Sequence, residues 1–208
     1  MYQKIEKIIS ALIETFGQPS FSSSVSNKRG LIPASVLIPL VIHQGKLSIL
    51  FTRRTNTVRD HQGQISFPGG AIEPIDESPL KAAYRETYEE IGISSREITK
   101  LGELSPRETI TGYFIYPYIG LINSLNHLHI NLVEVERILI VPICWLMDNA
   151  NSETKLYERP GVEKHSVIFY EEFEGEIIWG ITAAILQDFF YEIKNSEGNI
   201  PSLFECEE

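Results

Sequence analysis

Apolar residues recur at helical spacing in three segments of this chain. In residues 1–17, Lys and Glu lie between apolar residues that recur at helical spacing, a pattern typical of an amphipathic helix. A second helix is predicted over 79–91, and a third begins near Thr182 and continues to residue 194. The buried stripe of the second helix is predicted to contain Leu80, Ala83, Tyr84, Thr87 and Ile91.

Strand patterns occupy much of the remaining chain. Residues 35–54 predict two strands joined by a turn at 43–45, and residues 64–70 predict a short strand that ends in a turn. Further strand candidates are residues 113–122, 137–146, 165–172 and the start of 175–194. Strands thus flank one internal helix and precede a C-terminal helix. This order predicts an α/β or α+β sandwich around a mixed sheet.

The length of 208 residues suits one well-packed domain and is too short for two ordinary ones. We expect a helix and loop extension over 1–30, the main domain over 31–195 and an acidic tail over 196–208. A hydrophobic fraction of 43% and a charged fraction of 22% are typical of a soluble globular protein.

The formal charge of −10 argues against a general nucleic-acid binder, because the chain offers no broad basic stripe for phosphate backbones. No membrane association is expected: the longest apolar run, 138–147, is too short to span a bilayer, and the N-terminal segment lacks a signal-peptide pattern. Cys144 and Cys206 lie far apart without metal-type spacing, and Cys144 sits in an apolar run. A reduced, cytoplasmic protein is therefore expected.

The second helix has clear end signals and an unusual charge pattern. Ser78 and Pro79 are a typical N-cap and first helical residue, and Gly92 suits the position after the last turn. Glu86, Glu89 and Glu90 lie at i, i+3 and i+4 near the C-terminal end. Each like-charge pair at this spacing costs roughly 0.2–0.5 kcal/mol, and the negative end of the helix dipole adds to the repulsion.

Two interpretations of these three glutamates remain open on spacing alone. A solvated acidic face would have Lys or Arg interleaved, but no basic residue follows Arg85 until Arg96. A divalent cation would instead balance the charge, since clustered carboxylates suit Mg²⁺ or Mn²⁺.

The segment GGAIEPIDESPLKAAYRETYEEIGI, residues 69–93, resembles the box of the Nudix hydrolases. That box reads Gly, five residues, Glu, seven residues, then Arg-Glu-aliphatic-any-Glu-Glu-any-Gly-aliphatic. The second half matches at Arg85, Glu86, Glu89, Glu90, Gly92 and Ile93, and it departs from the pattern at Thr87. The first half is one residue too long, so either Asp76 or Glu77 can take the place of the upstream Glu, with Asp76 favoured by its distance from Gly70.

The extra residue, and a block upstream of the box, are similar to the coenzyme A pyrophosphatase branch of that family. The block is LFTRRTNTVRDHQGQISFPGG, residues 50–70. Residues 110–120 and 177–186 also look like that branch, so the resemblance covers most of 35–190. The box implies the superfamily and a Nudix-like α/β/α fold, whereas the block is the more specific signal for substrate.

The resemblance implies hydrolysis of a nucleoside-linked diphosphate by water activated at Mg²⁺ or Mn²⁺. It makes Glu86 and Glu90 the expected metal ligands, with Glu89 either a third ligand or the acceptor of the water's proton. The backbone of the turn at Gly69 and Gly70 can approach the metal, since no side chain intervenes.

The resemblance gives Arg85 a clamping role, in which it pairs with Asp76 or Glu77 and with Glu89. Four cationic residues of the upstream block are candidate contacts to the phosphates of coenzyme A: Arg53, Arg54, Arg59 and His61. Tyr113 and Phe114 could stack on adenine, although strand aromatics more often pack in a core. Glu134 and Glu136 could supply a further ligand or base, although a solvated pair beside a strand is the commoner arrangement.

The expected reaction splits coenzyme A, or an acyl ester of it, into 3′,5′-ADP and 4′-phosphopantetheine or its acyl form. Two alternatives stay open: a Nudix pyrophosphatase acting on ADP-ribose, NADH or other nucleotides, and a Nudix-like module that senses a nucleotide without cleaving it. The intact glutamate set favours an enzyme. The sequence leaves the oligomeric state undecided, a homodimer included.

Overall fold

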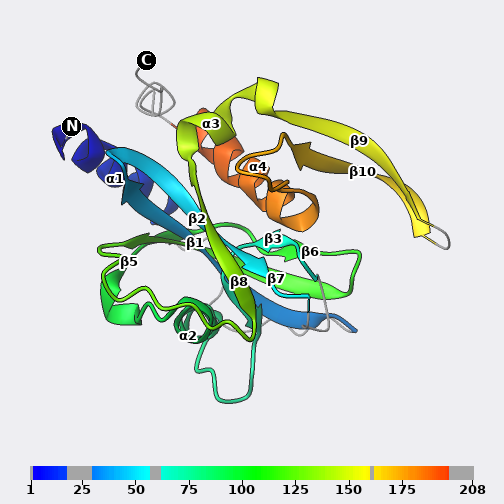
Figure 1. Cartoon of the computed structure of the whole chain (residues 1–208), viewed down its shortest axis with the longest axis horizontal. Helices are drawn as coiled ribbons and strands as arrows, with labels where there is room; N and C mark the ends of the chain where they lie inside the picture. Colours follow the sequence, from blue (N-terminus) through cyan, green and yellow to red (C-terminus); the bar gives the residue numbers. More distant parts are fainter. Residues whose placement is uncertain (1, 18–29, 57–61, 160–161, 197–208) are drawn as a thin grey trace.

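The computed structural model describes residues 2–17, 30–56, 62–159 and 162–196 (Figure 1). Several predicted features lie outside these ranges, namely Arg59, His61, Cys206, residues 18–29 of the predicted N-terminal extension and residues 197–208 of the predicted tail. The α-helices within the ranges are α1 (Tyr2–Phe16), α2 (Pro79–Ile91), α3 (Ile143–Met147) and α4 (Gly180–Asn195). Short 3₁₀ helices occupy Ser95–Glu97 and Asn149–Asn151.

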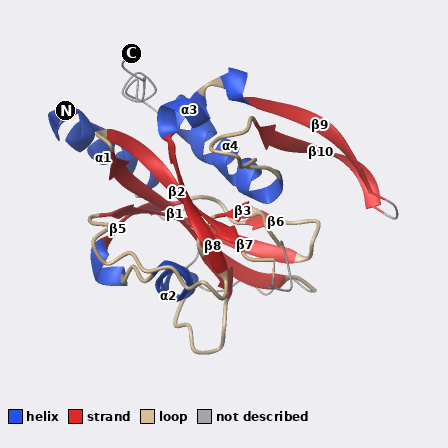
Figure 2. Cartoon of the chain, in the orientation of Figure 1, coloured by secondary structure: helices blue, strands red, loops and turns tan. Residues whose placement is uncertain are grey.

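One mixed sheet forms the centre of the molecule (Figure 2). Its strands are β1 (Ile32–His43), β2 (Lys46–Arg54), β3 (Ile65–Ser66), β4 (Gly69–Ala71), β5 (Ile98–Glu103), β6 (Arg107–Glu108), β7 (Tyr113–Ile122) and β8 (Val135–Pro142). The main order is β3-β2-β1-β7-β5, with β8 paired to β2, β4 to β1 and β6 to β7. Only β1 and β7 pair in parallel among the described strands, and the other pairs are antiparallel. A separate hairpin contains β9 (Ser152–Arg159) and β10 (Val162–Tyr170).

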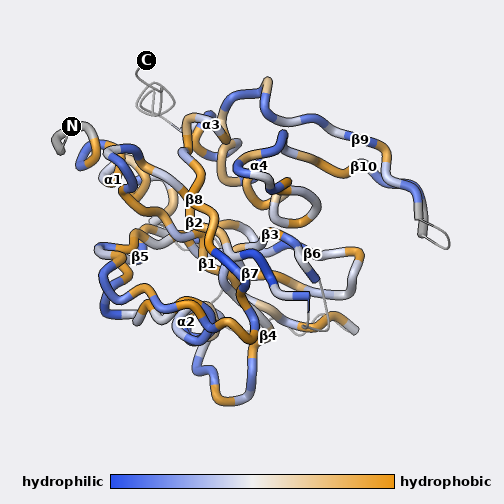
Figure 3. The backbone as a smooth tube through the Cα atoms, viewed as in Figure 1, coloured by the Kyte–Doolittle hydropathy of each residue, from blue (hydrophilic) through white to orange (hydrophobic). Residues whose placement is uncertain are grey.

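Helices cover both faces of the sheet, which confirms the predicted sandwich. α2 packs against β1, β4 and β7 on one face. α1 and α4 lie on the other face, where their buried side chains join a second hydrophobic core with β1, β2 and β8. Figure 3 shows hydrophobic residues concentrated on β8 and α4 and hydrophilic residues along much of β9. The sheet, with one hydrophobic core on each face, therefore lies between α2 and α4.

The second helix forms as its end signals predict. Ser78 accepts a hydrogen bond from the backbone N–H of Lys81, and Pro79 is the first helical residue. Gly92 ends the helix at φ 73°, a left-handed conformation that costs Gly little. The predicted stripe is shifted, because Leu80 and Tyr84 are half-buried while Ala82 and Glu90 are buried. A glutamate thus lies on the buried side of α2.

The N-terminal helix packs as part of the sandwich. Ile8, Leu12 and Phe16 are buried in the same core as α4. The ring of Phe16 stacks on that of Phe189, with centroids 5.3 Å apart. The apolar face of this amphipathic helix is therefore buried against other parts of the same chain.

Four strands were not predicted from the sequence, and two predicted strands were wrong in extent. Residues 69–70, which were predicted to form a turn, belong to the short strand β4, which pairs with β1. The strands β5, β6 and β9 were missed, because they are short or polar and only their partners β7 and β10 reveal them. The strand predicted over 137–146 ends at Pro142 and continues as α3, since a short apolar run fits a strand or a helix equally. The strand predicted before α4 is reduced to the isolated bridges Phe169–Trp179 and Phe173–Glu176.

The cysteine chemistry also differs from expectation. Cys144 lies half-buried in α3 and is disulfide-bonded, whereas the sequence predicted a reduced cysteine in the core. No helix among the described residues is long and apolar enough to cross a membrane.

Candidate active site

Two glycines bring the backbone of β4 against the acidic side of α2. A Cβ on Gly69 would lie 2.3 Å from the backbone oxygen of Ser35, and the residue has φ 153°. A Cβ on Gly70 would lie 2.5 Å from Oε1 of Glu86. Both distances are shorter than real Cβ contacts; the backbone at Ser35 cannot move away from Gly69, whereas beside Gly70 only the flexible end of Glu86 would have to shift. The Glu86 carboxylate therefore occupies the space beside the Gly70 backbone.

Arg85 connects the loop before α2 to the helix itself. Its Nε and Nη2 donate to the two carboxylate oxygens of Asp76 at 3.0 and 2.9 Å. Its Nη1 donates to Glu86 and Glu89, each at 2.9 Å, and Nη2 also donates to the Ala71 carbonyl. The hydrogen bonds from Arg85 hold the pKa of Asp76 below its usual range. A bidentate guanidinium–carboxylate pair of this kind fixes geometry as well as charge.

Of the two upstream acids that the sequence left open, Asp76 is the one that Arg85 contacts. The Asp76 side chain is 3% exposed, and one of its oxygens also accepts from the backbone N–H of Glu73. Glu77, the next residue, is exposed to solvent. The geometry therefore assigns the loop contact to Asp76.

Glu90 is a carboxylate buried at the centre of the site, with only 1% of its surface exposed. Thr52 Oγ1 donates to its Oε2 at 3.3 Å, and Arg54 Nη1 lies 3.5 Å from its Oε1. Burial raises the pKa of Glu90 to about 8, against the opposing attraction of Arg54, and repulsion from Glu86 and Glu134 adds to the rise. Thus the protein holds a carboxylate where its charge is poorly compensated.

Glu86 and Glu89 differ in their environment although they share the helix with Glu90. Burial raises the pKa of Glu86, attraction by Arg85 opposes the rise, and repulsion from Glu89 and Glu134 adds to it. Glu89 remains 47% exposed and pairs with Arg85 one turn earlier. The cost of burying a carboxylate near other carboxylates therefore falls mainly on Glu86 and Glu90.

Glu134 is a site residue that the sequence reasoning placed on the surface. It is half-buried, and its charge raises the pKa of both Glu86 and Glu90. Its loop is held in place because the backbone N–H of Asn131 donates to the Glu90 carbonyl and that of Thr55 to the Glu134 carbonyl. The only signal in the sequence was an acid shortly before a strand, a pattern too common to mark a site.

The cationic block is divided between two different environments. Arg53 forms ion pairs with Glu136 and with Glu176, whose Oε1 lies 2.9 Å from Arg53 Nε. Arg137 Nη2 donates to that same Glu176 oxygen at 2.6 Å. Arg53 is thereby part of a network between β2, β8 and the segment after β10. Its contact with substrate stays a prediction, as do those of Arg59 and His61, which lie outside the described residues.

Arg54 points toward the acidic cluster instead. Its Nη1 faces Glu90, and its Nε is buried without a hydrogen-bond partner in the described part of the chain. An unpaired buried donor of a cation is costly unless a ligand accepts from it. Arg54 therefore has one donor available beside the carboxylates.

The candidate stacking residues pack within the protein. Phe114 is buried and makes an edge contact with the ring of Tyr116, at 5.2 Å between centroids. Tyr113 is half-buried against the core on the α4 face. Both side chains therefore pack in or against the core, which was the second of the two arrangements considered for these strand aromatics.

The donor set of the site suits a hard divalent cation. Glu86, Glu89, Glu90 and Glu134 offer only carboxylate oxygens, the ligand type that Mg²⁺ and Mn²⁺ prefer. The Gly70 backbone leaves room for Glu86, and Glu86 and Glu90 carry charge that Arg54 and Arg85 compensate only partly. In the described residues, no three His, Cys, Asp or Glu side chains stand close enough together to form a ready metal site. The chemistry of the residues nevertheless fits such an ion.

Comparisons with known proteins agree with the box and the fold. A profile of the NUDIX domain matches residues 32–142. A protein of Photorhabdus laumondii named "Uncharacterized Nudix hydrolase NudL" is 35% identical, with 77% of this chain and 84% of the relative aligned. Its namesake in Pectobacterium atrosepticum is 33% identical over 78% of this chain and 83% of its own.

The solved structure of a MutT/nudix family protein from Enterococcus faecalis shares the fold. It has 15% sequence identity and a TM-score of 0.56, covering 86% of this chain and 68% of that one. From the domain match and these relatives, the chain belongs to the Nudix family of hydrolases. It is accordingly an enzyme that acts on pyrophosphate bonds, in a family that generally uses divalent metal ions.

The clamp can be tested by replacing Arg85 with Lys. We expect Arg85→Lys to lower kcat by about 10- to 100-fold although the charge is retained, because Lys cannot form the bidentate pair with Asp76. Asp76→Asn should give a comparable loss, and Glu77→Gln, on the adjacent exposed acid, should be nearly silent. Steady-state kinetics of the three variants measures this. Wild-type activity in Arg85→Lys, or equal losses in Asp76→Asn and Glu77→Gln, would contradict the clamp.

Proposed function

We propose that the protein hydrolyses the diphosphate bond of coenzyme A or its acyl esters, using Mg²⁺ or Mn²⁺. The products are 3′,5′-ADP and 4′-phosphopantetheine or its acyl form. The proposal combines the pyrophosphatase activity of the family with the resemblance of residues 50–70 to the coenzyme A branch.

One structural observation carries the proposal beyond the box. Thr52 and Arg54, both in the upstream block, contact the buried carboxylate of Glu90. The block that resembles the coenzyme A branch and the box that performs the hydrolysis therefore form one continuous site. Substrate selection and chemistry are thus coupled through neighbouring residues of β2 and α2.

Each residue of the site has a chemical role in this proposal. Glu86 and Glu90 would hold the cation, which would neutralise diphosphate charge and lower the pKa of the attacking water. Arg54 donates its free Nε to a phosphate oxygen beside Glu90. Glu134 accepts the proton of the water, because it approaches from a separate loop while Glu89 is engaged by Arg85.

The atoms balance in a single displacement. The water oxygen forms a bond to one phosphorus, and the bond from that phosphorus to the bridging oxygen breaks. The proton of the water passes to a carboxylate, and the leaving phosphate takes the electrons of the broken bond. Orientation of the diphosphate by Arg54 and the burial of Glu90, which limits the access of water to its carboxylate, favour this geometry.

The substrate assay compares coenzyme A with dephospho-coenzyme A, ADP-ribose and NADH in the presence of Mg²⁺ or Mn²⁺. We expect the fastest cleavage for coenzyme A, with products identified by phosphorus NMR, and loss of turnover after chelation. Dephospho-coenzyme A retains the diphosphate and lacks only the 3′-phosphate. A charge-assisted contact to that phosphate contributes about 1.5–3 kcal/mol, or roughly one to two orders of magnitude in kcat/KM.

Two arginine variants separate recognition from orientation. Arg59→Ala should raise KM for coenzyme A and abolish the preference over dephospho-coenzyme A, since the 3′-phosphate lies away from the bond that breaks. Arg54→Ala should lower kcat on both compounds, because Arg54 lies against Glu90. Equal wild-type rates on the two compounds would refute 3′-phosphate recognition. Faster cleavage of ADP-ribose would favour the broader nucleotide pyrophosphatase, and tight binding without products would favour a sensor.

A further inference from the structure

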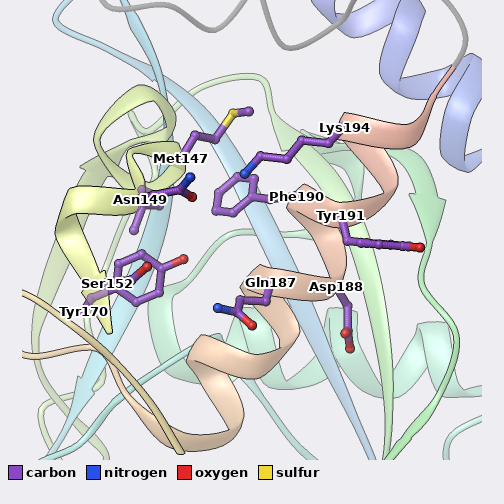
Figure 4. Close-up of a pocket in the computed structure, with 10 residues that line it drawn as sticks. Met147, Asn149, Ser152, Tyr170, Gln187, Asp188, Phe190, Tyr191 and Lys194 are labelled. Carbon is purple, nitrogen blue, oxygen red and sulfur yellow. The ribbon is translucent and has the colours of Figure 1, made fainter. Parts of the chain in front are cut away.

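A cavity lies on the face of the sheet opposite α2. It has a volume of about 290 Å³ and opens between α3, the start of β9 and α4 (Figure 4). Its walls combine apolar side chains, among them Met147 and Phe190, with several polar ones. None of the acidic residues of α2 lines it, and the sheet separates the two places.

Tyr170 is the most informative residue in the lining of this cavity. The residue is only 4% exposed, and its ring packs beside Trp145 at 6.2 Å between centroids. Figure 4 shows its hydroxyl directed into the cavity, and no hydrogen bond to that hydroxyl forms among the described residues. Burial raises the pKa of Tyr170, so the hydroxyl keeps its proton and is a donor. The hydroxyl therefore offers a donor to a ligand in the cavity.

Polar groups from other elements point to the same space. In Figure 4 the ammonium of Lys194, the amide of Gln187 and the amide of Asn149 extend toward the cavity from two sides. Within the described chain, Lys194 has no carboxylate partner. On the same helix, Glu192 is exposed to solvent, and Asp188, which also lines the cavity, is ion-paired with Arg107. The cavity therefore combines the ammonium of Lys194 with neutral hydrogen-bonding groups, while the carboxylate of Asp188 in its lining is paired with Arg107.

We propose that this cavity is a second ligand site, which binds a small organic anion whose carboxylate or phosphate group contacts Lys194 and Tyr170. The apolar part of the ligand packs against Phe190 and Met147. A cation and a hydroxyl donor that line one cavity match an anionic group, and the neighbouring amides fix its orientation. A volume near 290 Å³ is close to the lower end of ordinary ligand pockets, which restricts the ligand to small molecules.

The test measures binding of phenyl phosphate, benzoate and benzyl alcohol to the full chain by calorimetry. A chelator is present throughout, so that metal at the acidic site cannot recruit the phosphate. We expect one site with a dissociation constant of about 1 mM or lower for at least one anion, and weaker binding of the neutral alcohol. The tighter of the two anions identifies the phosphate or the carboxylate as the preferred group.

Variants locate the site. Lys194→Gln should weaken anion binding by about 10-fold or more, and Tyr170→Phe, which removes only the hydroxyl, by about 3- to 10-fold. Lys46→Gln, at the exposed first residue of β2, is the matched control and should bind like wild type. Melting curves confirm that each variant is folded.

Three results would each overturn the proposal. They are the absence of saturable binding of either anion to wild type, equal affinity for benzyl alcohol and the anions, and unchanged affinity in the folded Lys194→Gln variant.

Discussion

Glu90→Gln should lower kcat by about 10³-fold or more while the protein remains folded. The substitution removes a carboxylate whose charge the cation must balance, and charge stabilisation at such a centre supplies several kcal/mol. Glu86→Gln should have a similar effect. Glu192→Gln, an exposed acid on α4, is the control and should keep wild-type turnover. Single-turnover kinetics with coenzyme A measures the loss, and near wild-type rates in both site variants would refute the assigned roles.

The same variant should alter stability in the opposite direction when metal is absent. The pKa of Glu90 is raised to about 8 in the folded protein, from an ordinary value of 4.5, so the folded state binds this proton more tightly than the unfolded state. Metal-free wild type should therefore lose stability as pH rises from 4.5 to 8, by up to about 1.4 kcal/mol per pH unit. Glu90→Gln lacks this titration and should be the more stable protein at pH 8. Denaturant titrations at several pH values, with a chelator, measure the difference.

Gly70→Ala should abolish most turnover with little loss of stability. The added methyl group would lie 2.5 Å from Oε1 of Glu86, which is closer than any real contact. Glu86 ends a flexible side chain, so its carboxylate can move aside at small cost to folding. The displaced carboxylate is then out of position for the cation, and misplacement by about 1 Å costs on the order of 10²-fold in rate.

A double-mutant cycle distinguishes this cause from a general disturbance. Once Glu86→Gln has removed the ligand charge, adding Gly70→Ala should cost little more activity, because both changes act through one carboxylate. Gly69→Ala is the structural contrast, since its methyl group would meet the rigid backbone at Ser35 and should destabilise the fold. Additive losses in the double variant would show that Gly70 acts independently of Glu86.

Local signals were sufficient for the elements that carry the proposed catalytic residues. The Ser78 cap, Pro79 and Gly92 define α2 through interactions within a few residues, and the turn at Gln44 and Gly45, with φ 48° and 77°, joins β1 to β2 as predicted. The acidic cluster of α2 was visible for the same reason, since helical spacing alone brings Glu86, Glu89 and Glu90 together. Elements whose identity depends on a distant partner, such as β5 and β9, were not recoverable in this way.

What the sequence by itself determined was the family, the sandwich fold and the helix that bears the glutamates, because these depend on spacing and on residue types near one another. The tertiary structure decided which acid Arg85 holds, which glutamate is buried and which distant groups face it. Asp76 rather than Glu77 meets Arg85 because of the path of one loop, and Glu134 and Arg54 reach Glu90 from separate parts of the chain. Burial and the charges contributed by remote segments set the electrostatics of the site, and neither quantity is encoded in the spacing of a local motif.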